Sequence, residues 1–157
     1  MYKKYFLNFI LILSLFAISF AYYVQYILGH VPCNLCILQR APFLISIFLV
    51  IFFLIFKRFE KSVLISILIL FSFGFLISIY HFGIEKGFFE DSFICDLRNN
   101  ENILNKNDLL KSLEKTPISC KDVTFRVLGF SLATINAIIS LVICVITTKI
   151  LKNYENN

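Results

Sequence analysis

The chain contains 157 residues, of which 59% are hydrophobic and 16% are charged, whereas soluble domains are roughly 45–50% apolar and about 25% charged. This balance excludes an ordinary soluble globular domain and predicts one compact membrane domain over residues 1–157. The formal net charge of +5 comes without a stripe of phosphate-binding or base-reading side chains, so no nucleic-acid partner is expected.

Four apolar runs with at most one charged residue each predict membrane-spanning helices, because a hydrocarbon layer of roughly 30 Å needs about 20 residues of helix. They lie at about residues 6–28, 36–56, 63–82 and 127–148. For the first run the alternative is a cleaved signal peptide, since Lys3 and Lys4 precede it and Ser19-Phe20-Ala21 is a passable cleavage site. The run continues past that site, which favours a retained span. Pro42 inside the second run predicts a kink or a late helix start.

Basic residues outnumber acidic ones on one side of the four crossings, whereas acids and bases nearly cancel in the long segment from Glu85 to Lys121 on the other side. Three basic groups lie before the first run, between the second and third, and after the fourth: Lys3 and Lys4; Lys57, Arg58 and Lys61; Lys149 and Lys152. The positive-inside rule then places both termini in the cytoplasm and a long loop of about residues 83–126 outside. The predicted fold class is an all-α four-helix transmembrane bundle with a short first and a long second external loop. Within the long loop, the leucines of residues 108–115 predict a short helix, either on the membrane surface or as an ordinary surface helix.

A C-x-x-C pair, Cys33-Asn34-Leu35-Cys36, follows the first span directly. Such a pair serves thiol exchange and metal binding alike. Cys36 is expected in the first turn of the second helix, where the helix dipole favours a thiolate. Arg40 follows one turn later on the same face. There it either adds a fixed cation beside the sulfur or reaches the lipid headgroups as an interfacial arginine.

Cys95 and Cys120, here called the loop cysteines, fall in the predicted external loop among charged neighbours. In an oxidising compartment two such cysteines normally form a disulfide, which is either a static structural bridge or one half of an exchange relay. Their occurrence together with the C-x-x-C pair favours the relay. Cys144 lies among aliphatic residues of the fourth span and is interpreted as an inert packing residue.

Three polar residues near the external ends of the spans are candidates for a binding site. Gln25 lies near the end of the first span, His81 near the end of the third, and Glu85 one turn later. They either line a site for an aromatic, carbonyl-bearing, lipid-soluble oxidant or hydrogen-bond to neighbouring helices. Asn136, deeper in the fourth span, is interpreted as a residue that links two helices.

The sequence resembles the disulfide bond formation protein B (DsbB) family of bacterial inner-membrane oxidoreductases over essentially the whole chain. The most specific match is Gln25-Tyr26 followed by residues 32–40, PCNLCILQR, which resemble the family's P-C-x-L-C-x-x-Q/E-R element. Residues 81–87, HFGIEKG, are similar to an H-x-G-x-E-x-G element of one branch, and residues 128–132 resemble the stretch leading into the last helix. Leu38 departs from the pattern, because an aromatic residue is frequent there.

This resemblance implies a thiol oxidase that reoxidises a periplasmic thioredoxin-fold dithiol oxidase of the DsbA type. By the same resemblance, Cys95 forms the mixed disulfide with that partner, Cys120 exchanges with Cys33, and Cys36 reduces a bound quinone, either ubiquinone or menaquinone. The location implied is the bacterial inner membrane, with the cysteine loops in the periplasm. His81 matches the position of a histidine that is implicated at the family's quinone site. The candidate quinone-binding residues are Arg40, His81, Gln25 and Glu85.

Other functions remain as alternatives. A vitamin K epoxide reductase-like protein also couples loop cysteines to a C-x-x-C pair and a quinone, but there the loop cysteines come first in the chain. A metal-binding membrane module would use Cys33 and Cys36 as thiolate ligands, although the chain has one methionine and two histidines to extend a soft-metal path. A purely structural membrane protein would leave Arg40 beside Cys36 unexplained.

Overall fold

The computed structural model describes residues 2–57, 59–89, 126–127 and 129–155 of the chain. In this part of the chain, four long helices are accompanied by one short helix and a two-stranded antiparallel sheet. The elements are α1 (Tyr2–Tyr26), α2 (Asn34–Leu38), α3 (Ala41–Phe56), α4 (Glu60–Glu85), β1 (Arg126–Val127), β2 (Phe130–Ser131) and α7 (Leu132–Glu155).

Four helical segments in the described ranges are long and apolar enough to cross a membrane. They are Tyr5–Tyr26, Asn34–Phe56, Glu60–Glu85 and Leu132–Tyr154. The second of these segments combines α2 with α3. The predicted all-α bundle of four transmembrane helices is therefore confirmed.

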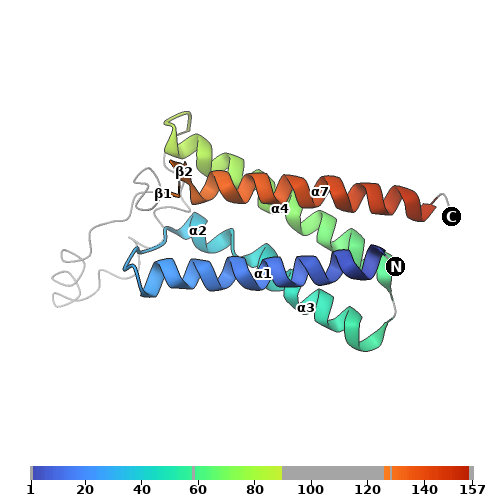
Figure 1. Cartoon of the computed structure of the whole chain (residues 1–157). Coiled ribbons are helices and arrows are strands. Elements are labelled where there is room, and N and C mark those ends of the chain that lie inside the picture. The colour runs from blue at the N-terminus through green and yellow to red at the C-terminus, as the bar shows by residue number, and fades with distance from the viewer. Residues whose placement is uncertain (1, 58, 90–125, 128, 156–157) are drawn as a thin grey trace, which may run out of the picture.

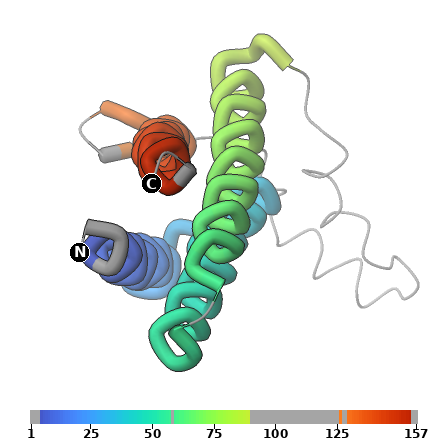
Figure 2. The backbone as a smooth tube through the Cα atoms, turned by 90° about the vertical axis from the view of Figure 1, so that its right-hand side faces the viewer, coloured from blue at the N-terminus to red at the C-terminus, as the bar shows by residue number. Residues whose placement is uncertain are grey.

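The two ends of the bundle carry different elements. Figure 1 shows α2 and the small sheet at one end, whereas the start of α1 and the end of α7 lie at the other. Helix α4 packs along α7, α1 packs against α3, and α3 packs against α4. Figure 2 looks nearly along the axes of α1 and α7 and shows α4 beside α7. The C-x-x-C segment in and before α2 thus lies at the end opposite both ends of the chain.

A short interruption at Gln39 and Arg40 separates α2 from α3 within the second span. Pro42 is the second residue of α3, a position where the missing N–H of proline removes no helical hydrogen bond. The predicted kink or late helix start is confirmed. The backbone stays paired across the interruption, because the N–H groups of Gln39 and Arg40 donate to the carbonyls of Leu35 and Ile37, each at 3.0 Å.

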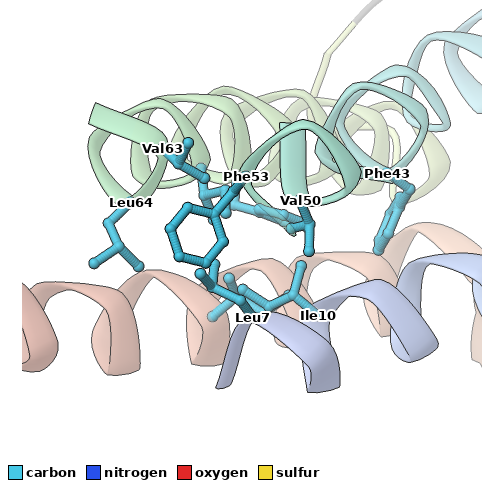
Figure 3. Close-up of a cluster of buried hydrophobic side chains, with 10 residues drawn as sticks. Leu7, Ile10, Phe43, Val50, Phe53, Val63 and Leu64 are labelled. Carbon is cyan, nitrogen blue, oxygen red and sulfur yellow. The ribbon is translucent and has the colours of Figure 1, made fainter. Parts of the chain in front are cut away.

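Apolar side chains of α1, α3 and α4, with Ile143 of α7, form the main core cluster. Figure 3 shows Val50 and Phe53 of α3 facing α1, where Leu7 lies next to Phe53. Nearer the α2 end, the rings of Phe43 and Phe71 meet edge to face, with centroids 5.3 Å apart and an interplanar angle of 85°. These contacts fix α3 between α1 and α4, and they thereby fix the position of α2.

Polar side chains also link the helices at membrane depth. The hydroxyls of Ser14 in α1 and Ser46 in α3 lie 2.9 Å apart. The amide Nδ2 of Asn136 in α7 donates to the hydroxyl of Ser78 in α4 at 2.8 Å. The predicted role of Asn136 as an interhelical hydrogen-bonding residue is confirmed, and such bonds help helices associate where water is absent.

The fourth span begins later than the sequence predicts. The prediction starts it at about residue 127, but residues 126–127 and 130–131 form the β1–β2 pairing and α7 begins at Leu132. Gly129 has a φ of +86° and supplies the left-handed backbone conformation that the tight turn between the strands requires. An apolar run does not reveal this pairing, because aliphatic and aromatic residues suit a strand as well as a helix.

Candidate active site

The two cysteines of the C-x-x-C pair lie within bonding reach of each other at the α2 end of the bundle. The Sγ atoms of Cys33 and Cys36 are 2.8 Å apart, compared with about 2.05 Å in a disulfide. Both are free thiols. Cys33 is buried, with 7% of its surface exposed, and Cys36 is half-buried. The pair is positioned to close into a disulfide with little movement.

Cys33 is the N-cap residue of α2. Its backbone is extended, and its Sγ accepts a hydrogen bond from the backbone N–H of Cys36 at 3.2 Å. The sequence predicts that the helix start stabilises the Cys36 thiolate, but the structure gives this stabilisation to Cys33. The reason is that the free N–H groups of the first turn point back towards the N-cap side chain and away from side chains within the turn.

Cys33 lies just outside the second span, and its surroundings favour the thiolate form. The hydrogen bond with the Cys36 thiol lowers the pKa of the Cys33 thiol, assisted by the His81 imidazole and opposed by burial. The thiolate is the reactive form in thiol–disulfide exchange, and a sulfur with a lowered pKa is a good leaving group. Of the two sulfurs, Cys33 therefore carries the stabilised charge.

The imidazole of His81 lies against Cys33. His81 comes from α4, is 3% exposed, and places its Nε2 atom 3.6 Å from the Cys33 Sγ. The carboxylate of Glu85, one helical turn further along α4, lies 3.8 Å from the same nitrogen. The structure thus brings together four of the predicted site residues, two from α4 and two from the C-x-x-C pair.

Gln39 is a further member of this site, and the sequence places it in the P-C-x-L-C-x-x-Q/E-R element without indicating a role for it. Its side-chain Nε2 lies 3.1 Å from the Nδ1 atom of His81, and only 6% of the residue is exposed. A signal was present, since Gln39 is an uncharged polar residue inside an apolar span and follows Cys36 by three residues, on the same helical face. Its partner, 42 residues away, is visible only in the folded chain.

Apolar side chains surround the sulfur atoms. Leu35 and Ile84 are fully buried and pack around Cys33, with Ile77 and Tyr80 at the edge of the same cluster. Little water reaches Cys33 in this setting. Hydrogen bonds to its sulfur are therefore stronger than they would be at an exposed position.

Arg40 and Gln25 form a second, separate pair. The guanidinium Nη1 of Arg40 donates to Oε1 of Gln25 at 2.7 Å, and its central carbon lies 5.3 Å from the ring centroid of Tyr22. Both partners belong to the end of α1, so Arg40 joins α1 to the start of α3. A role for Arg40 beside the Cys36 sulfur stays a prediction.

The loop cysteines Cys95 and Cys120 and the predicted helix over residues 108–115 lie outside the described residues. Cys144 is described, and it lies in α7 with its Sγ 3.5 Å from the hydroxyl of Ser72 in α4. It packs against the main core cluster. This is the kind of position expected for a packing residue.

The ligand atoms of Cys33, Cys36 and His81 all lie within 4.8 Å of one another, as the atoms of a metal site would. The separation of the two sulfurs argues for a redox pair. Two thiolates on one tetrahedral zinc ion, each at about 2.3 Å from the metal, stand about 3.8 Å apart, whereas these sulfurs are 2.8 Å apart. The geometry thus favours sulfur–sulfur chemistry over joint coordination of an ion.

Four segments able to cross a membrane, with a close dithiol beside a buried imidazole at one end, define a multi-pass membrane protein with a thiol redox site. Comparison with known families agrees with this class, because residues 3–150 match the family described as disulfide bond formation protein DsbB. The chain belongs to the DsbB family and is a membrane disulfide bond formation oxidoreductase. The family resemblance seen in the sequence is confirmed.

The chain is also similar to an uncharacterised protein of Rickettsia prowazekii (strain Madrid E). The two are 32% identical over 155 residues, which cover 96% of this chain and 90% of the relative. No solved structure matches the chain significantly. The similarity to the relative therefore extends over nearly the whole length of both proteins.

Proposed function

We propose that this oxidoreductase reoxidises a periplasmic thioredoxin-fold dithiol oxidase of the DsbA type and passes the electrons to a quinone of the inner membrane. The observation that carries the proposal is the sulfur pair of Cys33 and Cys36, 2.8 Å apart at the end of a membrane span. Membership of the DsbB family supports the direction of electron flow.

The proposed relay uses three thiol–disulfide exchanges up to the release of the oxidised partner. A thiolate of the reduced partner attacks Cys95 in a Cys95–Cys120 disulfide, so that a mixed disulfide forms and Cys120 leaves as a thiolate. Cys120 then attacks Cys33 in a Cys33–Cys36 disulfide, and Cys36 leaves with the electron pair. The second thiol of the partner attacks the mixed disulfide, which releases the oxidised partner and the Cys95 thiolate. Each step exchanges one S–S bond for another.

The residues around Cys36 suit a quinone. The half-buried Cys36 packs against the same apolar cluster as Ile77 and Tyr80, and the N–H groups of Arg40 are donors of the kind that carbonyl oxygens accept. When bound, a quinone takes up the two electrons and two protons that a dithiol gives up on forming its disulfide. The residues that we propose to hold it are Arg40, His81, Gln25 and Glu85.

The proposed orientation follows from the basic residues. Both termini lie in the cytoplasm, and the C-x-x-C end of the bundle and the loop cysteines face the periplasm. The arrangement in Figure 1, with the start of α1 and the end of α7 at one end and α2 at the other, supports this orientation.

A covalent trap tests the partner. In a Cys120→Ser variant, the Cys95 thiolate attacks the disulfide of the oxidised partner, and this chain has no second loop thiol to resolve the product. Non-reducing electrophoresis is expected to reveal an adduct of this chain with a thioredoxin-fold protein, identified by mass spectrometry and removed by dithiothreitol. Adding Cys144→Ser must leave the adduct intact, whereas adding Cys95→Ser must remove it. An adduct that survives loss of Cys95 contradicts the proposed relay.

A further inference from the structure

We propose that Gln39 is a positioning residue that holds the His81 imidazole against Cys33, so that His81 stabilises Cys33 as the leaving sulfur when a disulfide to Cys33 is broken. The inference deepens the proposed function, because it assigns a distinct role to one of the two sulfurs. The contacts that carry it do not involve the quinone or the partner.

Gln39 is a buried amide whose position suits this role. It stands at the interruption between α2 and α3, and its backbone N–H donates to the carbonyl of Leu35 at 3.0 Å. The side-chain amide is directed at α4, where its Nε2 lies 3.1 Å from Nδ1 of His81. A buried amide without a partner would be destabilising, so this bond fixes both side chains across the two spans.

The hydrogen bond from Gln39 also determines where His81 carries its proton. In this orientation the Gln39 amide donates to Nδ1, and the proton of the neutral imidazole therefore lies on Nε2. The Nε2–H group faces two acceptors, the Cys33 Sγ at 3.6 Å and the Glu85 carboxylate at 3.8 Å. Gln39 thus presents an N–H donor to the Cys33 sulfur.

Cys33 receives donors from two different elements. The backbone N–H of Cys36 reaches its sulfur from α2 at 3.2 Å, and the imidazole reaches it from α4. When the Cys95 thiolate attacks Cys120 in a Cys120–Cys33 disulfide, a Cys95–Cys120 bond forms and the electron pair of the broken bond leaves on Cys33. Both donors stabilise that anion. No proton has to move in this step.

Cys33 reactivity in the absence of partner and quinone tests the inference. The full-length protein carrying Cys95→Ser and Cys120→Ser is reduced in detergent, and the alkylation rate of Cys33 by iodoacetamide is measured against pH by mass spectrometry. The titratable groups facing Cys33 are Cys36 from α2 and His81 with Glu85 from α4. Adding Gln39→Leu removes the amide at similar volume, and we expect the midpoint of the profile to rise by about one pH unit or more.

Two further variants separate positioning from a general structural effect. Gln39→Asn keeps an amide donor that is one carbon shorter, and its midpoint should lie between those of the parent and Gln39→Leu. Ser14→Ala removes a buried interhelical hydrogen bond far along the bundle and should leave the midpoint unchanged. An unchanged midpoint in Gln39→Leu, or an equal rise in Ser14→Ala, overturns the inference. A failure of quinone-dependent turnover would count against the proposed function alone, because alkylation of Cys33 requires no quinone.

Discussion

At the scale of single residues, the two cysteines of the C-x-x-C pair differ in their surroundings. Cys33 is buried, caps α2 and lies against His81, whereas Cys36 is half-buried at the edge of an apolar cluster. The N-cap position stabilises a charge on the Cys33 sulfur. This division suits a pair in which Cys33 exchanges with a protein thiol and Cys36 faces a lipid-soluble acceptor.

Replacement of Arg40 tests the proposed quinone contact. Because a hydrogen bond to a charged group contributes roughly 1.5–3 kcal/mol, Arg40→Ala is expected to raise the KM for quinone about tenfold or more. The loop disulfide should still form, since Arg40 takes no part in the exchanges. Steady-state kinetics with varied quinone and alkylation of free thiols measure the two effects.

Lys86→Ala is the matched control for Arg40→Ala, because Lys86 is an exposed cation at the same end of the bundle, over the ring of Phe82. Its KM should equal that of the parent. An unchanged KM in Arg40→Ala would leave Arg40 only the structural role of joining α3 to Gln25.

Sequence patterns reveal only part of this site. The C-x-x-C pair and the polar residues near the span ends can be found from spacing and from the rarity of polar groups at membrane depth. The Gln39–His81 contact cannot, because it joins residues from different spans. The sequence pattern also assigns the thiolate stabilisation by the start of α2 to Cys36. Only the backbone geometry shows that the N–H group of Cys36 faces the Cys33 sulfur instead.

At the scale of elements, the end of α4 fixes the register of His81 and Glu85. The helix is closed by a Schellman motif, in which the N–H of Phe88 donates to the carbonyl of Gly83 at 2.8 Å and the N–H of Gly87 to that of Ile84 at 3.0 Å. Gly87 has a φ of +76°, which side chains with a Cβ rarely adopt. The motif ends the helix directly after the site.

Gly87→Ala is expected to destabilise the protein by about 1 kcal/mol, because alanine is strained at positive φ. A Cβ at this position meets no atom within 4 Å, so the loss reflects backbone conformation alone. Unfolding in detergent, followed by circular dichroism, measures this loss of stability. Gly87→Asn should lose less stability than Gly87→Ala, since asparagine tolerates the positive-φ region. Equal stability of Gly87→Ala and the parent would contradict this account of the helix end.

The helices themselves are largely predictable, because the thickness of a bilayer sets a minimum length for an uncharged run. Pro42 likewise predicts the late start of α3, since proline suits the first turn of a helix. The β1–β2 pairing ahead of α7 is not predictable in this way. It depends on a turn at Gly129, and its apolar residues merge with the span that follows.

At the scale of the whole molecule, the bundle separates its thiol site from the ends of the chain. Four described segments can cross a membrane, and α2 lies at the end opposite the start of α1 and the end of α7. A site at the end of a span lies next to both the aqueous loop and the lipid. This placement suits an enzyme that takes electrons from a soluble protein and delivers them to a membrane-soluble acceptor.

Quinone-dependent thiol oxidation by the purified full-length protein tests this account most directly. A reduced thioredoxin-fold dithiol protein is supplied in detergent, and the loss of free thiols is followed together with quinone absorbance. We predict oxidation only when quinone is added, with one quinone reduced for each disulfide formed, since both are two-electron changes. Cys36→Ser should abolish turnover and Cys144→Ser should retain it. Oxidation without quinone, or quinone-dependent turnover that survives Cys36→Ser, would contradict the account.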